Sequence, residues 1–144
     1  MAQAVLFACT MNAVRSPMAA ALLHHLTRSG IHIESAGVRA GDLDPLAVEA
    51  MDEIGLAIAK HQPRRFEDLE DGSFDLVITL SPEAQHKAME MTRTAATLVE
   101  YWPTMDPTAV EGSREQRLSA YRAVRDGLME RLKQRFLEPS ASDT

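Results

Sequence analysis

Short apolar runs alternate with helical patterns along most of the chain, and polar residues, glycine or proline separate the two kinds of segment. These runs are five to seven residues long and predict strands, and the second of them alternates between apolar and polar residues. The predicted strands are Ala4–Ala8, Ile31–Ser35, Phe74–Leu80 and Thr97–Tyr101. The first is continuously apolar, which is typical of a strand buried on both faces of a parallel sheet.

Helical patterns lie between and after these runs, and several begin at a proline. Proline favours the first helical position and serine is a common N-cap, which predicts helix starts at Ser16-Pro17 and Ser81-Pro82. The predicted helices run from Pro17 to about Arg28, from Pro45 to about Ile54, from Pro82 to about Met91 and from Arg114 to Leu137, with a short helix around Phe66–Leu69. Alternating strands and helices predict an α/β fold with a parallel sheet and right-handed crossovers.

The single cysteine of the chain, Cys9, follows the first apolar run directly, and Arg15 comes after a loop of five residues. In so short a loop the backbone N–H groups can converge on one point, and the helix that begins next aims its positive end at the same place. Such a site attracts an anion and stabilises a thiolate, the reactive form of cysteine. The segment Trp102–Asp106 also follows a strand, at the edge of a parallel sheet where ligands bind.

One domain is expected from 144 residues, covering residues 1–138, with a flexible tail at residues 139–144. The net charge of −6 argues against a nucleic-acid partner, because such partners are attracted through their phosphates. The apolar stretches fall far below the roughly 20 residues of a membrane span, and no signal peptide is expected. A single cysteine excludes an intramolecular disulfide and suits a reducing compartment, so we expect a cytoplasmic protein without membrane contact.

The stretch Val5–Ala19, VLFACTMNAVRSPMA, resembles the phosphate-binding loop of the low-molecular-weight protein tyrosine phosphatases, a family that includes arsenate reductases of the same fold. The similarity continues in the family's order through Glu34–Val38, His61, Phe74–Ile78 and Asp106-Pro107. These motifs span almost the whole chain. The resemblance implies a three-layer α/β/α fold with a central four-stranded parallel sheet, of the phosphotyrosine protein phosphatase I type.

The resemblance also implies phosphoryl transfer in two steps through a phosphocysteine on Cys9, with no metal and no other cofactor. Arg15 would hold two phosphoryl oxygens in a bidentate grip, and Asp106 would act as general acid and then as general base. Ser16 would donate a hydrogen bond to the thiolate. The residues expected to bind the phosphoryl group from the loop are Thr10, Met11, Asn12, Ala13, Val14 and Ser16.

A polar network steadies this loop in the family, and the matching residues are Asn12, Ser35 and His61. The chain departs from the family at three places. Many members have glycine at the position of Met11. Val14 stands where many members have a second cysteine, and Thr108-Ala109 replaces an aromatic pair found after Asp-Pro in many tyrosine phosphatases. Trp102, with Tyr101 beside it, is then the available aromatic side chain for a substrate-binding wall.

Three functions stay open on this basis. The first is a metal-independent phosphatase that acts on phosphomonoesters. Its expected substrate is phosphotyrosine, and its partner would be a phosphorylated protein or a small phosphomonoester. Inorganic phosphate or other oxyanions would also fit the loop. The second is a single-cysteine arsenate reductase that uses an external low-molecular-weight thiol or glutaredoxin, because the thioredoxin-coupled type needs two further cysteines. The third is a non-catalytic anion-binding protein that retains the loop.

Overall fold

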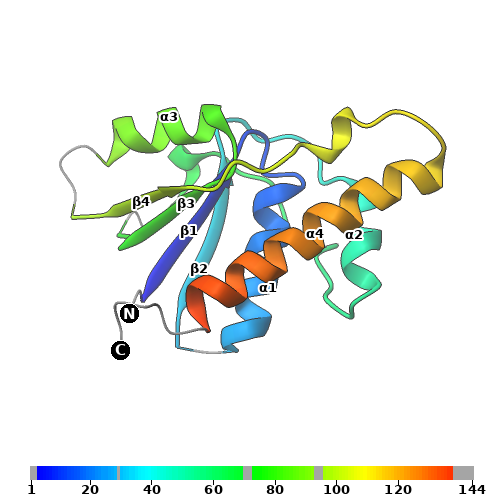
Figure 1. Ribbon diagram of the computed structural model, residues 1–144. Coiled ribbons are helices and arrows are strands. Elements are labelled where there is room, and N and C mark those ends of the chain that lie inside the picture. Colours follow the sequence, from blue (N-terminus) through cyan, green and yellow to red (C-terminus); the bar gives the residue numbers. More distant parts are fainter. Residues whose placement is uncertain (1–2, 29, 70–72, 93–95, 138–144) are drawn as a thin grey trace.

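The computed structural model describes residues 3–28, 30–69, 73–92 and 96–137, so the expected tail at residues 139–144 lies outside the described residues. Its strands are β1 (Ala4–Cys9), β2 (His32–Gly37), β3 (Leu76–Thr79) and β4 (Leu98–Tyr101). All neighbouring strands pair in parallel, and their order in the sheet is β2-β1-β3-β4 (Figure 1). The predicted parallel sheet is confirmed, with strand ends shifted by one or two residues.

The helices are α1 (Arg15–Thr27), α2 (Pro45–Asp52), α3 (Pro82–Met91) and α4 (Arg114–Phe136), with 3₁₀ turns η1 (Phe66–Asp68) and η2 (Pro107–Ala109). Helices α1, α2 and α4 cover one face of the sheet, whereas α3 covers the other (Figure 1). The three-layer architecture is therefore confirmed. None of the described helices is long and apolar enough to cross a membrane.

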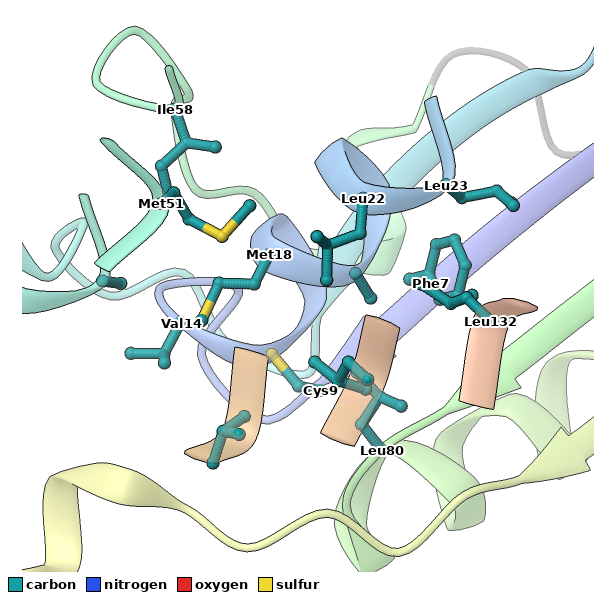
Figure 2. Packing of buried hydrophobic residues seen from close by; sticks show 14 of the residues in the cluster. Phe7, Cys9, Val14, Met18, Leu22, Leu23, Met51, Ile58, Leu80 and Leu132 are labelled. Carbon is teal, nitrogen blue, oxygen red and sulfur yellow. The ribbon is translucent and has the colours of Figure 1, made fainter. Parts of the chain in front are cut away.

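Strand β1 is buried on both faces, because its alternate side chains enter two separate apolar clusters. Val5, Phe7 and Cys9 pack with the side chains of α1, α2 and α4, whereas Leu6 and Ala8 pack toward α3. Figure 2 shows Phe7 and Cys9 within the first cluster, with α1 side chains and Leu132 of α4 around them. This double burial explains the continuous apolar run and fixes the position of Cys9 at the end of the strand.

The start of α1 differs from the predicted cap-and-proline pattern. The helix begins at Arg15, and Val14 occupies the N-cap position without a side-chain hydrogen bond. The same pattern at Ser81 does cap α3, since its hydroxyl accepts the N–H of Ala84 at 3.2 Å. The hydroxyl of Ser16 is engaged elsewhere, beside the sulfur of Cys9. The prediction of Ser16 as a helix cap was therefore wrong.

The chain after β4 crosses the carboxyl end of β3 and arrives beside the loop that follows β1. The N–H of Trp102 bonds the carbonyl of Thr79 at 2.8 Å, and the N–H of Thr104 bonds the carbonyl of Leu80 at 3.1 Å. Leu80 is itself tied to β1 by its N–H, which bonds the carbonyl of Ala8 at 2.8 Å. These contacts bring two segments that lie far apart in the sequence to one edge of the sheet.

Candidate active site

The loop between β1 and α1, residues 10–14, turns back on itself through Asn12. This residue has a φ of 53°, in the left-handed region that asparagine tolerates better than most residues. The Asn12 side chain is fully buried, so the turn is held from beneath as well as by its backbone.

The five backbone carbonyl groups from Cys9 to Ala13 all accept hydrogen bonds from the surrounding chain. The bonds are Val38 N–H to Cys9 O at 3.1 Å, Arg39 N–H to Thr10 O at 2.8 Å, Gly41 N–H to Met11 O at 2.9 Å, His61 Nε2 to Asn12 O at 3.3 Å, and Asp44 N–H to Ala13 O at 3.2 Å. In a trans peptide the C=O of one residue and the N–H of the next point in opposite directions. Five consecutive N–H groups, from Thr10 to Val14, therefore point to the inner side of the loop and form an anion cradle.

Gly37, the last residue of β2, makes this arrangement possible by its lack of a side chain. A Cβ atom there would lie 2.7 Å from the N of Asn12 and 2.5 Å from the carbonyl oxygen of Arg39. The loop thus sits directly on the β2 backbone. Gly37 lies beyond the predicted strand Ile31–Ser35, so its close contact with the loop was not predicted from the sequence.

Cys9 lies at the base of the cradle and is only 2 % exposed. Its Sγ is 2.9 Å from the Oγ of Ser16. The Ser16 oxygen also accepts a hydrogen bond from Nδ2 of Asn12 at 2.8 Å, so its own hydrogen is free to be donated. The alternative acceptor, the carbonyl of Ala36, is at 3.5 Å, which makes the sulfur the better placed partner.

The predicted supporting residues Asn12, Ser35 and His61 do contact one another. Nδ2 of Asn12 donates to Ser35 Oγ at 3.0 Å, and Oδ1 of Asn12 lies 3.0 Å from Nε2 of His61. The same Oδ1 accepts the backbone N–H of Arg64 at 3.0 Å, which fixes the orientation of the amide. Because both Asn12 atoms near His61 are acceptors, Nε2 carries the ring hydrogen. Burial lowers the pKa of His61 from its ordinary value, against the opposing effect of the Asn12 hydrogen bond, so the ring is neutral at neutral pH.

Arg64 is part of this network although no sequence pattern marked it. Besides its backbone bond to Asn12, its Nε donates to the carbonyl of Ser35 at 3.1 Å, and its guanidinium pairs with Glu34. A lone arginine in a polar stretch is most often on a solvated face, which is why the sequence alone gave no reason to select it.

Thr10, which was expected to contribute to the cradle, bonds Ser81 Oγ with its hydroxyl at 3.0 Å.

Asp44 joins the outer part of the cradle to two helices. Its N–H bonds Ala13, its carboxylate caps α2 by accepting the N–H of Leu46 at 2.8 Å, and it accepts the hydroxyl of Tyr121 in α4 at 2.5 Å. Tyr121 is almost fully buried, and burial is the main cause that raises its pKa, with Asp44 adding to the effect. Asp44 is therefore occupied by structural contacts.

Arg15 and Asp106 meet at the mouth of the cradle. Nη1 of Arg15 donates to the carbonyl of Thr104 at 3.0 Å, and Nη2 lies 3.9 Å from Oδ2 of Asp106. The Arg15 side chain is 10 % exposed and that of Asp106 is 46 % exposed. The Arg15 guanidinium is thus buried, whereas the Asp106 carboxyl group is exposed at the mouth of the cradle, where a substrate can reach it.

Cys9, Arg15 and Asp106 line a single pocket of about 410 Å³. The other lining residues come from the cradle, the segment before α2, η2 and the start of α4: Met11, Ala13, Val14, Gly41, Asp42, Leu43, Asp44, Pro45, Thr108 and Arg117. None of these has an aromatic ring. Among the described residues there is also no group of three or more His, Cys, Asp or Glu side chains arranged to hold a metal ion.

Trp102, the expected aromatic wall, does not line this pocket. It is 3 % exposed, its Nε1 donates to Glu100 at 3.1 Å, and the guanidinium of Arg131 lies 4.7 Å from its ring centre. It borders a separate groove of about 370 Å³ between its own loop and α4. The structure therefore gives Trp102 a packing role behind the loop and does not bring it together with Cys9.

The comparisons with known proteins agree with this geometry. A family model described as low molecular weight phosphotyrosine protein phosphatase matches residues 4–141. The chain belongs to this family. An arsenate reductase of Shouchella clausii is 34% identical over 130 residues, which are 90% of this chain and 91% of that protein. An arsenate reductase of Bacillus licheniformis is 35% identical over 134 residues, which are 93% and 94% of the two chains.

Solved structures of phosphatases have the same fold. One of them is the arginine phosphatase YwlE, solved as a mutant with a phosphorylated active-site serine in place of a cysteine. It is 28% identical to this chain, with a TM-score of 0.73, and the match covers 92% of each chain. The tyrosine phosphatase Wzb from Escherichia coli K30, in complex with sulphate, has a TM-score of 0.75 over 93% of this chain and 96% of its own. At 21% identity Wzb supports the fold only. Both phosphatases and arsenate reductases are thus relatives of this chain.

Proposed function

We propose that the protein is a metal-independent phosphatase that hydrolyses phosphomonoesters through a phosphocysteine intermediate on Cys9. The observation that carries this proposal is the convergence of Cys9, Arg15 and Asp106 on one pocket, above five inward-pointing N–H groups. The cradle supplies donors for the phosphoryl oxygens, the sulfur is the nucleophile and the carboxyl group is the proton donor. The expected substrate class includes phosphotyrosine.

In the first step, the Cys9 thiolate attacks phosphorus as the bond to the leaving oxygen breaks. Asp106 gives its proton to that oxygen, so the product leaves as a neutral alcohol or phenol. Arg15 and the N–H groups bind the equatorial oxygens, whose negative charge they stabilise throughout the transfer. Because Arg15 is already bonded to the Thr104 carbonyl, its guanidinium is held in place before the substrate arrives.

In the second step, water attacks phosphorus and the S–P bond breaks. Asp106 accepts a proton from this water, while Ser16 donates its hydrogen bond to the departing Cys9 thiolate. Inorganic phosphate is released and the protonated Asp106 is restored. YwlE, solved with a phosphorylated serine in place of an active-site cysteine, supports the idea of a phosphoryl group carried at this position.

Arsenate reduction is the second candidate, because arsenate fits the same cradle and the two relatives from Shouchella clausii and Bacillus licheniformis are arsenate reductases. Cys9 would attack arsenic and displace water, and a thiol would then be needed to discharge the adduct as a disulfide. The sequence has no second cysteine, so this thiol would come from a small molecule or from glutaredoxin.

A side-by-side assay of p-nitrophenyl phosphate hydrolysis and thiol-dependent arsenate reduction tests the proposal. We expect hydrolysis that is abolished in Cys9→Ser and reduced by roughly 10²-fold in Asp106→Ala. Vanadate is expected to inhibit it competitively. Reduction of arsenate without ester hydrolysis would replace the proposal by the second candidate. Anion binding without either reaction, in a correctly folded protein, would make the chain a non-catalytic binding protein.

The leaving group is a separate question, because the pocket has no aromatic wall. Phosphotyrosine peptides should be compared with phosphoarginine peptides, the latter suggested by the arginine phosphatase YwlE. A preference for phosphotyrosine of at least tenfold in kcat/KM would support the expected substrate. A preference for phosphoarginine would retain the phosphocysteine mechanism and change the substrate class.

A further inference from the structure

Within the described part of the chain, the hydrogen bonds to the Asp106 carboxyl group go to Oδ1, and Thr108 donates both of them. Oδ1 accepts the backbone N–H of Thr108 at 3.0 Å and the Thr108 hydroxyl at 2.7 Å. Oδ2 is the oxygen that faces Arg15, at 3.9 Å from Nη2. Asp106 is the N-cap of η2, whose first residue, Pro107, is buried and anchors the turn.

This asymmetry decides which oxygen carries the transferable proton. A carboxyl oxygen has two lone pairs, and two hydrogen bonds to Oδ1 occupy both of them. A proton added to Asp106 therefore resides on Oδ2. Oδ2 faces Arg15, which lines the same pocket as Cys9, so the proton is directed toward the group that would bind the phosphoryl oxygens.

We propose that Thr108 is a positioning residue for the acid–base step, which fixes the rotation of the Asp106 carboxyl group and directs its proton to Oδ2. This inference rests on the proposed phosphatase function. The Thr108 hydroxyl stands where the sequence lacks the aromatic pair expected after Asp-Pro. It lines the same pocket as Cys9, and its side-chain and backbone hydrogen bonds both go to the Asp106 carboxyl group.

In the first step, Oδ2–H transfers its proton to the leaving oxygen as the P–O bond breaks and the S–P bond forms. In the second step, the ionised Oδ2 takes a proton from water as the new P–O bond forms and the S–P bond breaks. Thr108 keeps its hydrogen bonds to Oδ1 throughout and exchanges no proton. Its effect should therefore grow with the demand of the leaving group for a proton.

The test compares Thr108→Val with Thr108→Ser, using phenyl phosphate and 2,4-dinitrophenyl phosphate as substrates. Valine has the shape of threonine without the hydroxyl. We expect Thr108→Val to lose about threefold to tenfold in kcat/KM for phenyl phosphate, as for one lost hydrogen bond, and to change little for dinitrophenyl phosphate, which leaves without a proton. Thr108→Ser should restore most of the loss, and the remote control Thr27→Val should show none.

A double-mutant cycle separates positioning from general loosening of the turn. If Thr108 acts through the acid, Thr108→Val causes no further loss in an Asp106→Ala background. Equal losses for both substrates, a loss that persists without Asp106, or an unchanged Thr108→Val enzyme would overturn the inference while leaving the phosphatase function intact. A wild-type protein that hydrolyses neither ester would overturn the proposed function, and the inference with it.

Discussion

Two small polar side chains, Asn12 and Ser16, determine which hydrogen bond the sulfur of Cys9 accepts. The Asn12 amide is oriented by the N–H of Arg64, so its Nδ2 donates to Ser16 and leaves the Ser16 hydrogen for Cys9. The position of one buried hydrogen thus follows from a backbone contact of a residue 52 positions away in sequence. Ser16 is well placed to stabilise a thiolate leaving group.

Substitution of Ser16 by alanine is expected to slow the second step more than the first. A hydrogen bond to a charged group contributes about 1.5–3 kcal/mol, so loss of the Ser16 donor should lower kcat by roughly 10- to 100-fold. The phosphoenzyme should then accumulate. A larger burst of p-nitrophenol in stopped-flow experiments is the measurement that checks this expectation.

Ser35→Ala is the matched control for Ser16→Ala. Ser35 also accepts a hydrogen bond from Asn12, at 3.0 Å, but no contact joins its hydroxyl to the sulfur. We expect a smaller fall in kcat than for Ser16→Ala, with no enlarged burst. If both variants lost kcat and kcat/KM to the same extent, the role of Ser16 would be to hold Asn12 and not to stabilise the thiolate.

Among the elements, the contact between the cradle and β2 depends on Gly37. A Cβ atom at this position would be 2.9 Å from the carbonyl carbon of Met11 and closer still to the Asn12 nitrogen. All of these neighbours are backbone atoms, so the loop itself would have to move. Gly37→Ala should therefore destabilise the fold by about 1–3 kcal/mol and weaken phosphate binding.

Urea unfolding and competitive inhibition by phosphate measure these two effects. Gly127→Ala in α4 is the control, because a Cβ there meets nothing within 4 Å. The control should be neutral or more stable by up to about 1 kcal/mol, since alanine is the better helix former. A Gly37→Ala protein with normal stability and normal phosphate affinity would show that the loop is not held against β2.

The elements were predictable from the sequence wherever local signals act. Buried strands, the proline starts of α2 and α3 and the amphipathic α4 depend on residues close together in the chain, and the structure has them near the predicted limits. No helical turn was predicted at Pro107–Ala109, where the structure has the 3₁₀ turn η2, because three residues are too few to show a helical period. Ser16 failed as a predicted cap because a tertiary partner, the sulfur of Cys9, engages its hydroxyl.

The candidate site was predictable where one loop contains its residues and less so where tertiary packing assembles it. Cys9, Arg15 and Asn12 lie within seven residues of one another. Arg64 and Gly37 join the site through contacts across the fold, which a single sequence does not record. Trp102 follows a strand at the correct edge of the sheet, but its ring packs behind the loop, under Arg131.

For the whole molecule, the count of one cysteine determines its response to oxidation. Peroxide converts the Cys9 thiolate to a sulfenic acid, and a second thiol must then condense with it to form a disulfide. With no second cysteine in the chain, we expect an external thiol to be required. Activity lost after brief peroxide treatment should return with glutathione or dithiothreitol and should not return in buffer alone.

A second cysteine placed in the cradle should change this behaviour. Val14 is buried, lines the same pocket as Cys9 and stands where many family members have a cysteine. In Val14→Cys the new thiol should condense with the Cys9 sulfenic acid, release water and form an intramolecular disulfide. The intact mass should then show the loss of two hydrogens, and full activity should return on reduction even after prolonged peroxide. If Val14→Cys were over-oxidised as fast as the wild type, the cradle would be holding the two sulfurs too far apart to form a disulfide. The geometry of the loop, and not the lack of a second cysteine alone, would then leave Cys9 open to irreversible oxidation.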